Sequence, residues 1–338
     1  PPLMVYLAAG VSGLTAIVGT FFIKDYLNLS AAFLASLGFW AGLPWALKMP
    51  LGHLVDLIWK HKAYLVGLGA AVIAASLLIM FGLIGHTEFM ASIMPVEAWF
   101  VTSVILGPVG YVIQDVVADA MTVEAVPEQD ENGDDIDLDQ LKIMHTTMQT
   151  LGRFAIIGGT VLVSLANVIL FSDVDRLDTA ARIDLYARIY LYALIIPAIA
   201  IVGVILARIQ HTYRNARIQK LYHTPTSQHQ RPEINWSILL GSLVFVVFSL
   251  SVGTSGIGYA QEIVFAGSVG IILFLMKRLM RFLPPEKRLM IVGTAIIIFT
   301  FRAMPSPGPG LTWFEIDQLL FNEQFLSILS LIASILTL

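Results

Sequence analysis

The chain has 338 residues, of which 57% are apolar and only 13% are charged, and its formal net charge at pH 7 is −4. Soluble globular proteins are nearer half apolar and a quarter charged. This composition excludes a soluble globular protein, a disordered chain, a coiled coil and a nucleic-acid-binding protein. The absence of cysteine also excludes a disulfide scaffold and a thiolate metal site. The sequence therefore predicts a polytopic membrane protein.

Ten long apolar segments are expected to cross the membrane. Only helices and closed barrels satisfy the backbone in lipid, and these runs are too long for barrel strands, so we predict an all-α protein. The first segment is not a signal peptide, because no basic stretch precedes it. In chain order the predicted spans are 3–23, 31–50, 63–85, 96–123, 143–170, 187–209, 236–254, 259–280, 289–316 and 324–338.

The distribution of lysine and arginine predicts the orientation. The loops and helix ends on one side hold 14 of the 20 basic residues, the other side holds 4, and two lie inside spans. Cytoplasmic loops carry the excess of basic residues. We therefore place the amino terminus in the cytoplasm, with the protein in a cell inner or plasma membrane. A plastid or thylakoid membrane is the alternative.

A segment near the start of the chain is repeated near its end. Aligning residues 20–41 with residues 312–333 gives identical residues at 8 of 22 positions, among them Asp25 and Asp317. Eight predicted helices separate the two copies, so both run in the same direction, as the halves of one large class of secondary transporters do. We expect Asp25 and Asp317 to cap the helices that follow them. A shared gate on the outer side is the alternative.

Two motifs in the first half of the chain resemble those of a known family. Residues 44–64 read PWALKMPLGHLVDLIWKHKAY, and residues 115–124 read DVVADAMTVE. The first resembles the cytoplasmic signature of the major facilitator superfamily, and both are similar to motifs of the folate–biopterin transporter family. The resemblance implies a major facilitator fold and proton-coupled transport of a small organic anion of the folate or pterin type. The cytoplasmic gate residues that it implies are Lys48, Gly52, Asp56, Lys60 and Glu124.

The repeat and the resemblance together predict how the chain is divided. Each half of such a transporter has six helices, so two of the predicted spans form an inserted pair, and fourteen spans are expected in the full protein. Because residue 338 ends inside an apolar run, we expect the chain to be a fragment. The predicted parts are a six-helix half at 1–209, a cytoplasmic linker at 210–235, the inserted pair with a basic loop at 236–288, and the start of a second half at 289–338.

Two carboxylates lie inside the fourth predicted span. Tyr111, Asp115 and Asp119 are four residues apart and share one face of a helix. Neighbouring carboxylates repel each other when both are ionised, and burial favours the protonated form. We interpret Asp115 and Asp119 as a proton-coupling pair and Tyr111 as a substrate-binding residue. The alternative is a structural pair that a basic residue on a neighbouring helix neutralises.

Two arginines also lie inside predicted spans. Arg153 shares a helix face with Gln149, and we favour pairing of Arg153 with a carboxylate of the fourth span over contact of both residues with substrate. Arg302 precedes three prolines between residues 305 and 309, which are expected to break the helix. Transporters place binding sites at broken helices. We therefore interpret Arg302 as the anchor of a substrate carboxylate, with an internal ion pair as the alternative.

The sequence also bears on functions other than transport, namely metal binding, catalysis and assembly of a larger complex. In the acidic loop at 128–139, a calcium-binding loop that starts at Asp130 would need glycine at its sixth position and glutamate at its twelfth, but the sequence has Asp135 and Leu141 there. We therefore predict a solvated loop, no metal and no cofactor. An enzyme is not expected, because the two aspartates of span four have no second aspartate-rich motif. A non-transporting assembly or pigment-delivery factor within a larger membrane complex stays open. The partners expected of a transporter are an anionic substrate, protons and the lipid bilayer.

Overall fold

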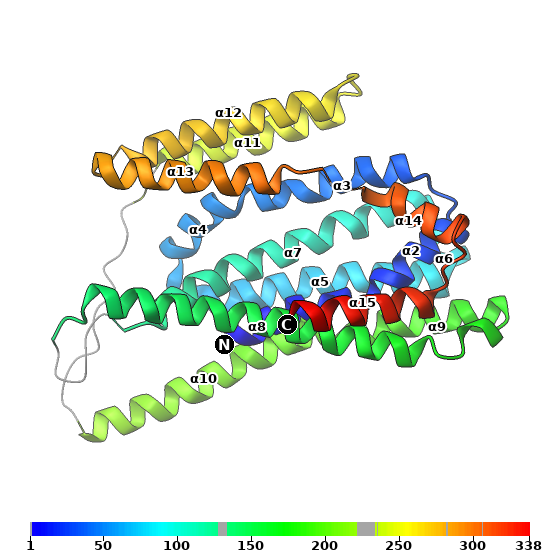
Figure 1. Cartoon of the computed structure of the whole chain (residues 1–338), viewed down its shortest axis with the longest axis horizontal. Helices are drawn as coiled ribbons and strands as arrows, with labels where there is room; N and C mark the ends of the chain where they lie inside the picture. Colours follow the sequence, from blue (N-terminus) through cyan, green and yellow to red (C-terminus); the bar gives the residue numbers. More distant parts are fainter. Residues whose placement is uncertain (1, 128–133, 222–233, 235, 282, 306) are drawn as a thin grey trace. The chain divides into compact units, whose positions relative to one another are not determined.

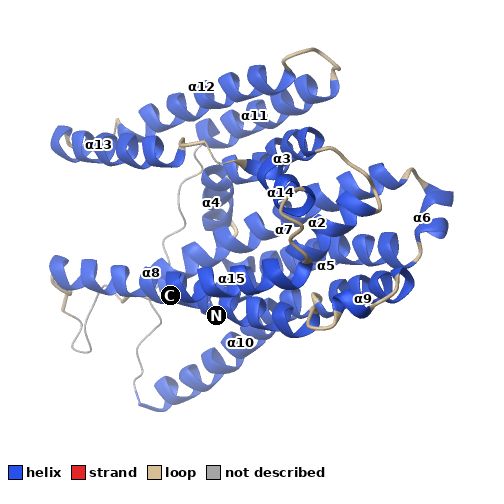
Figure 2. Ribbon diagram, turned by 45° about the vertical axis from the view of Figure 1, so that its right-hand side comes forward, coloured by secondary structure: helices blue, strands red, loops and turns tan. Residues whose placement is uncertain are grey.

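The computed structural model describes every residue except 1, 128–133, 222–233, 235, 282 and 306. The described residues form helices and loops, and no strand occurs among them (Figure 2). Seven helical segments in this part of the chain are long and apolar enough to cross a membrane, which confirms the predicted class of all-α membrane protein. The longer helices are α1 (Pro2–Val11), α2 (Ala16–Asp25), α3 (Ala31–Ala46), α4 (Lys48–Leu57), α5 (Lys62–Gly85), α7 (Val96–Glu124), α8 (Leu138–Leu170), α9 (Thr179–Tyr192), α10 (Ile195–Leu221), α11 (Trp236–Thr254), α12 (Ala260–Met280), α13 (Pro285–Arg302), α14 (Gly308–Asp317) and α15 (Glu323–Thr337).

Three of the ten predicted spans are not among the seven helical segments that are long and apolar enough to cross a membrane in the described part of the chain. The segments predicted at 31–50 and 324–338 contain the shorter apolar helices α3 and α15, of 16 and 15 residues. The segment predicted at 289–316 contains two helices, because α13 ends at Arg302 and α14 begins at Gly308. Pro305 and Pro307 lie between them and cannot donate helical hydrogen bonds, so the predicted break is confirmed. The total of ten spans and the major facilitator arrangement stay predictions.

The chain forms two compact units, 1–231 with 313–338, and 232–312. In the second unit α11 packs against α12. In the first unit α5 packs along α7, α1 packs along α8 and α10, and α15 packs along α8 and α2 (Figure 1). We call the two ends of this first bundle the α4 end, where α5 begins and α7 ends, and the α6 end, where the short helix α6 (Thr87–Ile93) connects the end of α5 to the start of α7.

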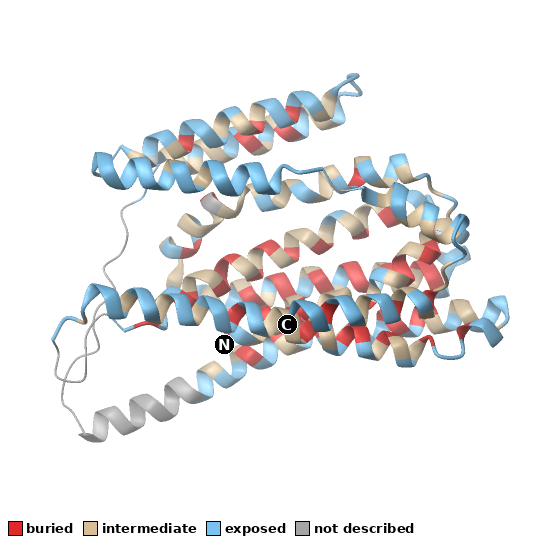
Figure 3. Ribbon diagram, viewed as in Figure 1, coloured by how far each residue is buried: buried red, intermediate tan, exposed pale blue. Residues whose placement is uncertain are grey.

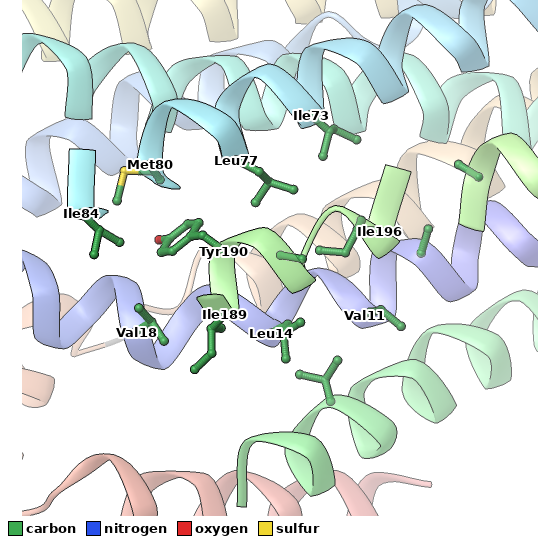
Figure 4. Close-up of a cluster of buried hydrophobic side chains, with 14 of the residues drawn as sticks. Val11, Leu14, Val18, Ile73, Leu77, Met80, Ile84, Ile189, Tyr190 and Ile196 are labelled. Carbon is green, nitrogen blue, oxygen red and sulfur yellow. The ribbon is translucent and has the colours of Figure 1, made fainter. Parts of the chain in front are cut away.

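The core of the first unit lies where α1, α2, α5 and the α9–α10 segment meet. Figure 3 shows the buried residues concentrated on these helices and on α7. In Figure 4, Val18 of α2, Leu77 of α5 and Tyr190 of α9 approach one another from three sides. All are almost completely buried. Apolar side chains also face outward from this bundle, as expected of a surface that lipid covers.

Two pairs of helices cross at glycine residues, where their backbones approach each other closely. A Cβ atom on Gly10 of α1 would lie 2.1 Å from the carbonyl oxygen of Ile156, and one on Gly159 of α8 would lie 3.0 Å from the Cα of Gly10. At the crossing of α5 and α7, a Cβ on Gly110 would lie 2.7 Å from the carbonyl oxygen of Gly69. Small residues allow helix backbones to approach this closely in membranes. These glycines therefore set the spacing of the two helix pairs.

The two copies of the repeat have the same helix boundaries. The first copy contains the end of α2 at Asp25 and the start of α3 at Ala31. The second copy contains the end of α14 at Asp317 and the start of α15 at Glu323. Both pairs of positions differ by 292 residues, the offset of the sequence alignment. The repeat is therefore present in the backbone as well as in the sequence.

The turn that connects the two helices has the same positive φ and the same capping hydrogen bond in both copies. Asn28 and Leu320 occupy equivalent positions with φ of 50° and 57°. The side chain of Ser30 accepts a hydrogen bond from the Phe33 amide at 3.1 Å, and that of Asn322 accepts from the Phe325 amide at 2.8 Å. These two residues cap α3 and α15. The capping role predicted for the repeated aspartates is therefore wrong.

Candidate functional site

The two carboxylates of α7 share one lysine from α4. The Nζ atom of Lys48 lies 2.6 Å from Oδ2 of Asp115 and 2.7 Å from Oδ2 of Asp119. Residues four apart on a helix lie on one face, and α4 packs across that face at the α4 end of the bundle. The side chain of Asp115 is 21% exposed and that of Asp119 is 47% exposed. The lysine therefore joins α4 to α7 through a partly buried three-charge cluster.

A tyrosine of α1 completes this cluster. The hydroxyl of Tyr6 donates a hydrogen bond of 2.6 Å to Oδ1 of Asp119, so α1, α4 and α7 meet at one group of polar side chains. One lysine faces two carboxylates here, which leaves a surplus of one negative charge when all three are ionised. Such a cluster is suited to binding a proton or another cation rather than an anion.

Arg153 does not form the ion pair predicted for it. We expected it to pair with Asp115 or Asp119, but the partner of both is Lys48. Arg153 and Gln149 lie on an exposed face of α8, and neither makes an ion pair or side-chain hydrogen bond with the residues that the structure describes. Tyr111 is half-buried and packs against the hydrophobic core. Within the part of the chain that the structure describes, no hydrogen bond or ion pair joins these three residues, and their role in binding substrate stays a prediction.

A second ion pair lies at the same end of the bundle. The Nζ atom of Lys62 contacts Oε2 of Glu124 and lies 3.8 Å above the ring of Trp59. The indole nitrogen of that tryptophan donates a hydrogen bond of 3.1 Å to Oε1 of Glu124. The end of α7 is thus tied to the start of α5, close to the loop where the resemblance places a gate.

The remaining residues of the predicted gate motif have no such contacts. Gly52 lies on α4 with open space where a Cβ would be. Asp56 and Lys60 are exposed, and neither pairs with another residue in the described part of the chain. Of the predicted gate residues, Lys48 and Glu124 are the two for which the described part of the chain shows ion pairs.

At the α6 end, the two copies of the repeat meet through a lysine. The Nζ atom of Lys24 lies 2.5 Å from Oδ1 of Asp317 and 3.7 Å from Oδ1 of Asp25. The lysine side chain is mostly buried. The repeated aspartates are thus neighbours, and one cation links the second copy to the first.

A further carboxylate of the second copy is buried nearby. Oε1 of Glu323, at the start of α15, accepts a hydrogen bond from the hydroxyl of Tyr186 on α9. The Nη1 atom of Arg182 lies 3.8 Å from the same oxygen. Tyr26 packs edge-on against Tyr186, and burial raises the pKa of the Tyr26 hydroxyl above its ordinary value, so this tyrosine stays neutral. The α6 end therefore holds a second polar cluster.

Arg302 ends α13 in the second unit. Its side chain is exposed, and it makes no ion pair with a residue of its own unit among those described. The internal ion pair considered for it is therefore not found within that unit. Of the acidic loop, residues 128–133 lie outside the described part of the chain. In the part that is described, no cluster of three metal-ligating side chains occurs.

Sequence reasoning overlooked several of the residues that form these clusters. Tyr6, Tyr186 and Arg182 lie among apolar or loop residues without a motif of their own, and Lys62 lies inside the first motif but was assigned no role. Glu323 had a signal, because Ser327, Ser330 and Ser334 follow it at the spacing of one helix face. An acidic residue heading a polar stripe in an apolar helix indicates a face turned toward protein rather than lipid.

Comparisons with known proteins do not assign the chain to a family. A scan against protein-family models, a search of curated proteins and a search of solved structures each found no match. The resemblance to the folate–biopterin transporter family therefore rests on sequence motifs alone, chiefly the two quoted above.

Proposed function

We propose that the chain belongs to a secondary active transporter, which moves a small organic anion of the folate or pterin type across a membrane by alternating access. Transport is coupled to protons, and the α4 end of the first unit faces the cytoplasm. The protein acts without a cofactor and carries out no covalent reaction on its substrate.

The observation that carries this proposal is the repeat whose two copies meet at Lys24 and Asp317. Parallel repeats relate the halves of one class of secondary transporter, and these halves move against each other around a central site. An ion pair between the copies at one membrane end is a contact that such a motion would break and remake. At the opposite end, the group formed by Lys48, Asp115, Asp119 and Tyr6, which we call the Lys48 cluster, supplies contacts between helices of the first half.

The charge of the Lys48 cluster supports coupling to protons. Ionisable residues inside membranes are costly unless they are paired, and in transporters they mark proton relays. With one lysine for Asp115 and Asp119, binding of one proton would remove the surplus negative charge. Binding and release of that proton would then change the strength of the link between α4 and α7.

Arg302 supports an anionic substrate. A guanidinium group is always charged and matches the two oxygens of a carboxylate. It stands where α13 is interrupted by prolines, and transporters place half-helix ends at their binding sites. The glutamate tail of a folate would supply such a carboxylate, whereas a simple pterin has none.

Uptake into proteoliposomes tests the proposal. We expect an imposed proton gradient to drive uptake of labelled folate and of a labelled pterin. Arg302→Gln should reduce folate uptake by about tenfold, because a charge-assisted pair with the substrate is lost, while pterin uptake is retained. Arg278→Gln removes an exposed charge in the same unit and serves as the matched control.

Each outcome has a separate meaning. If Arg302→Gln takes up neither folate nor pterin, while the wild type and Arg278→Gln take up both, the transport function is supported. The role of Arg302 as an anchor for a substrate carboxylate is then contradicted. No uptake of either compound by folded wild-type protein would contradict transport of this substrate class. Stable co-purification with a larger complex in that case would favour the assembly factor.

A further inference from the structure

An apolar groove opens on the outer surface of the first unit, between α1, α8 and the α9–α10 segment. Its volume is about 650 Å³, within the range of about 300–1,000 Å³ that is usual for ligand-binding pockets. Leu162 and Ile195 on its rims are exposed. All its lining groups are apolar except the hydroxyl of Tyr192. Because a bound water needs several polar partners, a hydrocarbon chain fits this groove better than water does.

The residues of its walls explain why the groove is there. Buried Val11 and Leu14 form its floor (Figure 4). Ala166 gives the α8 wall a small side chain. Pro197 cannot donate a helical hydrogen bond, and the third wall is interrupted just before it, between α9 and α10. A short side chain and an interrupted helix thus leave a space along the surface of the bundle.

The groove has nearly the length of one leaflet of a bilayer. Leu162 and Leu170 both line it and stand eight residues apart on α8, which is about 12 Å along the helix axis. The hydrocarbon core of a bilayer is about 30 Å thick, so one leaflet contributes about 15 Å. A Cβ on Gly85, where the span α5 ends, would lie 3.5 Å from that of Ala187 on α9. This part of α9 is therefore level with a membrane boundary, and the groove runs inward from the headgroups at the α6 end.

Three polar side chains of α9 lead from the groove toward these headgroups. Asp184, Arg188 and Tyr192 are spaced four residues apart, share one face of the helix and are exposed. Tyr192 lines the groove, Arg188 stands one turn farther out, and Asp184 stands one turn beyond Arg188. Oδ2 of Asp184 lies 2.7 Å from Nη2 of Arg188, but an exposed pair of this kind contributes little to stability. A cation and an anion are therefore both present at the mouth of the groove.

We infer that this groove binds one zwitterionic phospholipid, with an acyl chain along its walls, the phosphate on Arg188 and the ammonium group on Asp184. A guanidinium group has five donors and matches phosphate oxygens in pairs, so Arg188 can bind a phosphate while it stays beside Asp184. The phosphate of such a lipid lies deeper than its ammonium group, in the same order as the two residues along α9. An anionic phospholipid would meet Asp184 as a like charge. The inference concerns a bound lipid and does not depend on what the protein transports.

Native mass spectrometry of the full chain in detergent tests this inference, with dioleoylphosphatidylethanolamine as the probe. We expect the first lipid to bind at least about tenfold more tightly than later ones, which only cover the apolar surface. Ala166→Trp and Ile199→Trp, on two different walls, should each abolish this tight binding by filling the groove. Ala198→Trp, at an exposed position of α10 outside the groove, should keep it. Thermal unfolding of each variant shows whether it is folded.

Two further substitutions separate the headgroup contacts from the apolar ones. Arg188→Gln should weaken the first binding by about tenfold, because a charge-assisted hydrogen bond to the phosphate is lost. Asp184→Asn should remove the preference for phosphatidylethanolamine over the anionic phosphatidylglycerol. Arg176→Gln is the matched control, because this arginine is also exposed at the α6 end and pairs with Asp173, and it should change neither result.

Three results would overturn the inference. Equal affinities for the first and later lipids would show that the groove takes only bulk lipid. Tight binding that survives in both folded groove-filling variants would place the lipid elsewhere. Equal effects of Arg188→Gln and Arg176→Gln, or a diacylglycerol that binds as tightly as phosphatidylethanolamine, would show that no phosphate is bound at Arg188.

Discussion

Replacing Gly159 by alanine is expected to destabilise the protein by about 2 kcal/mol, because overpacking a close contact has this order of cost. The new Cβ would lie 2.8 Å from the carbonyl oxygen of Leu7 and 3.0 Å from the Cα of Gly10. These are backbone atoms, which cannot rotate away as a side chain could, so α1 and α8 must separate. Thermal unfolding in detergent measures the change.

The neighbouring glycine provides the matched control for this crossing. A Cβ on Gly158 has nothing within 4 Å, and at a helix position with free space alanine is more stable than glycine by about 0.5–1 kcal/mol. Gly158→Ala should therefore raise the unfolding temperature while Gly159→Ala lowers it. Equal effects of the two changes would show that the helix backbones are not in contact there.

Replacing Lys48 by methionine is expected to destabilise the protein by about 2 kcal/mol. Breaking a buried ion pair by removing one partner costs roughly 3–5 kcal/mol, and the partial exposure of Asp115 and Asp119 reduces this. The two carboxylates would repel each other without their shared cation. The free energy of unfolding, or the unfolding temperature, reports the loss.

A combined variant shows whether the loss comes from the charges. Adding Asp115→Asn and Asp119→Asn to Lys48→Met should recover most of the stability, because no unbalanced charge remains. Lys60→Met, at an exposed lysine in the same region, should change stability by less than about 0.5 kcal/mol. A triple variant no more stable than Lys48→Met would assign the effect to the lysine stem and its packing.

The sequence predicted the all-α membrane class and the positions of seven candidate spans in the described part of the chain, because length and apolarity alone identify membrane helices. The repeat was also found from aligned residues such as Asp25 and Asp317, and the helix boundaries bear it out. The role of those aspartates was predicted wrongly, since capping was assigned by their position near a helix start. Ser30 and Asn322 stand closer to the helices and accept the capping hydrogen bonds.

The ion-pair partners of the buried charges could not be predicted from the sequence in the same way. Helix periodicity placed Asp115 and Asp119 on one face correctly, but it does not tell which helix covers that face. Arg153 seemed the nearest cation because it lies on the next predicted span, whereas Lys48 reaches both carboxylates from a helix earlier in the chain. Such contacts depend on tertiary packing, which no local pattern of a single sequence specifies.

The glycine crossings have a consequence for how this bundle can deform. At Gly10 and Gly159, and at Gly69 and Gly110, backbone touches backbone, so a small slide along the helix axis would drive the chains into each other. Each crossing therefore resists sliding, and we expect α1 with α8, and α5 with α7, to move as rigid pairs. The hydroxyl groups of Ser164 and Ser330 can exchange partners over short shifts, so we expect relative movement within the bundle to be easier between α8 and α15.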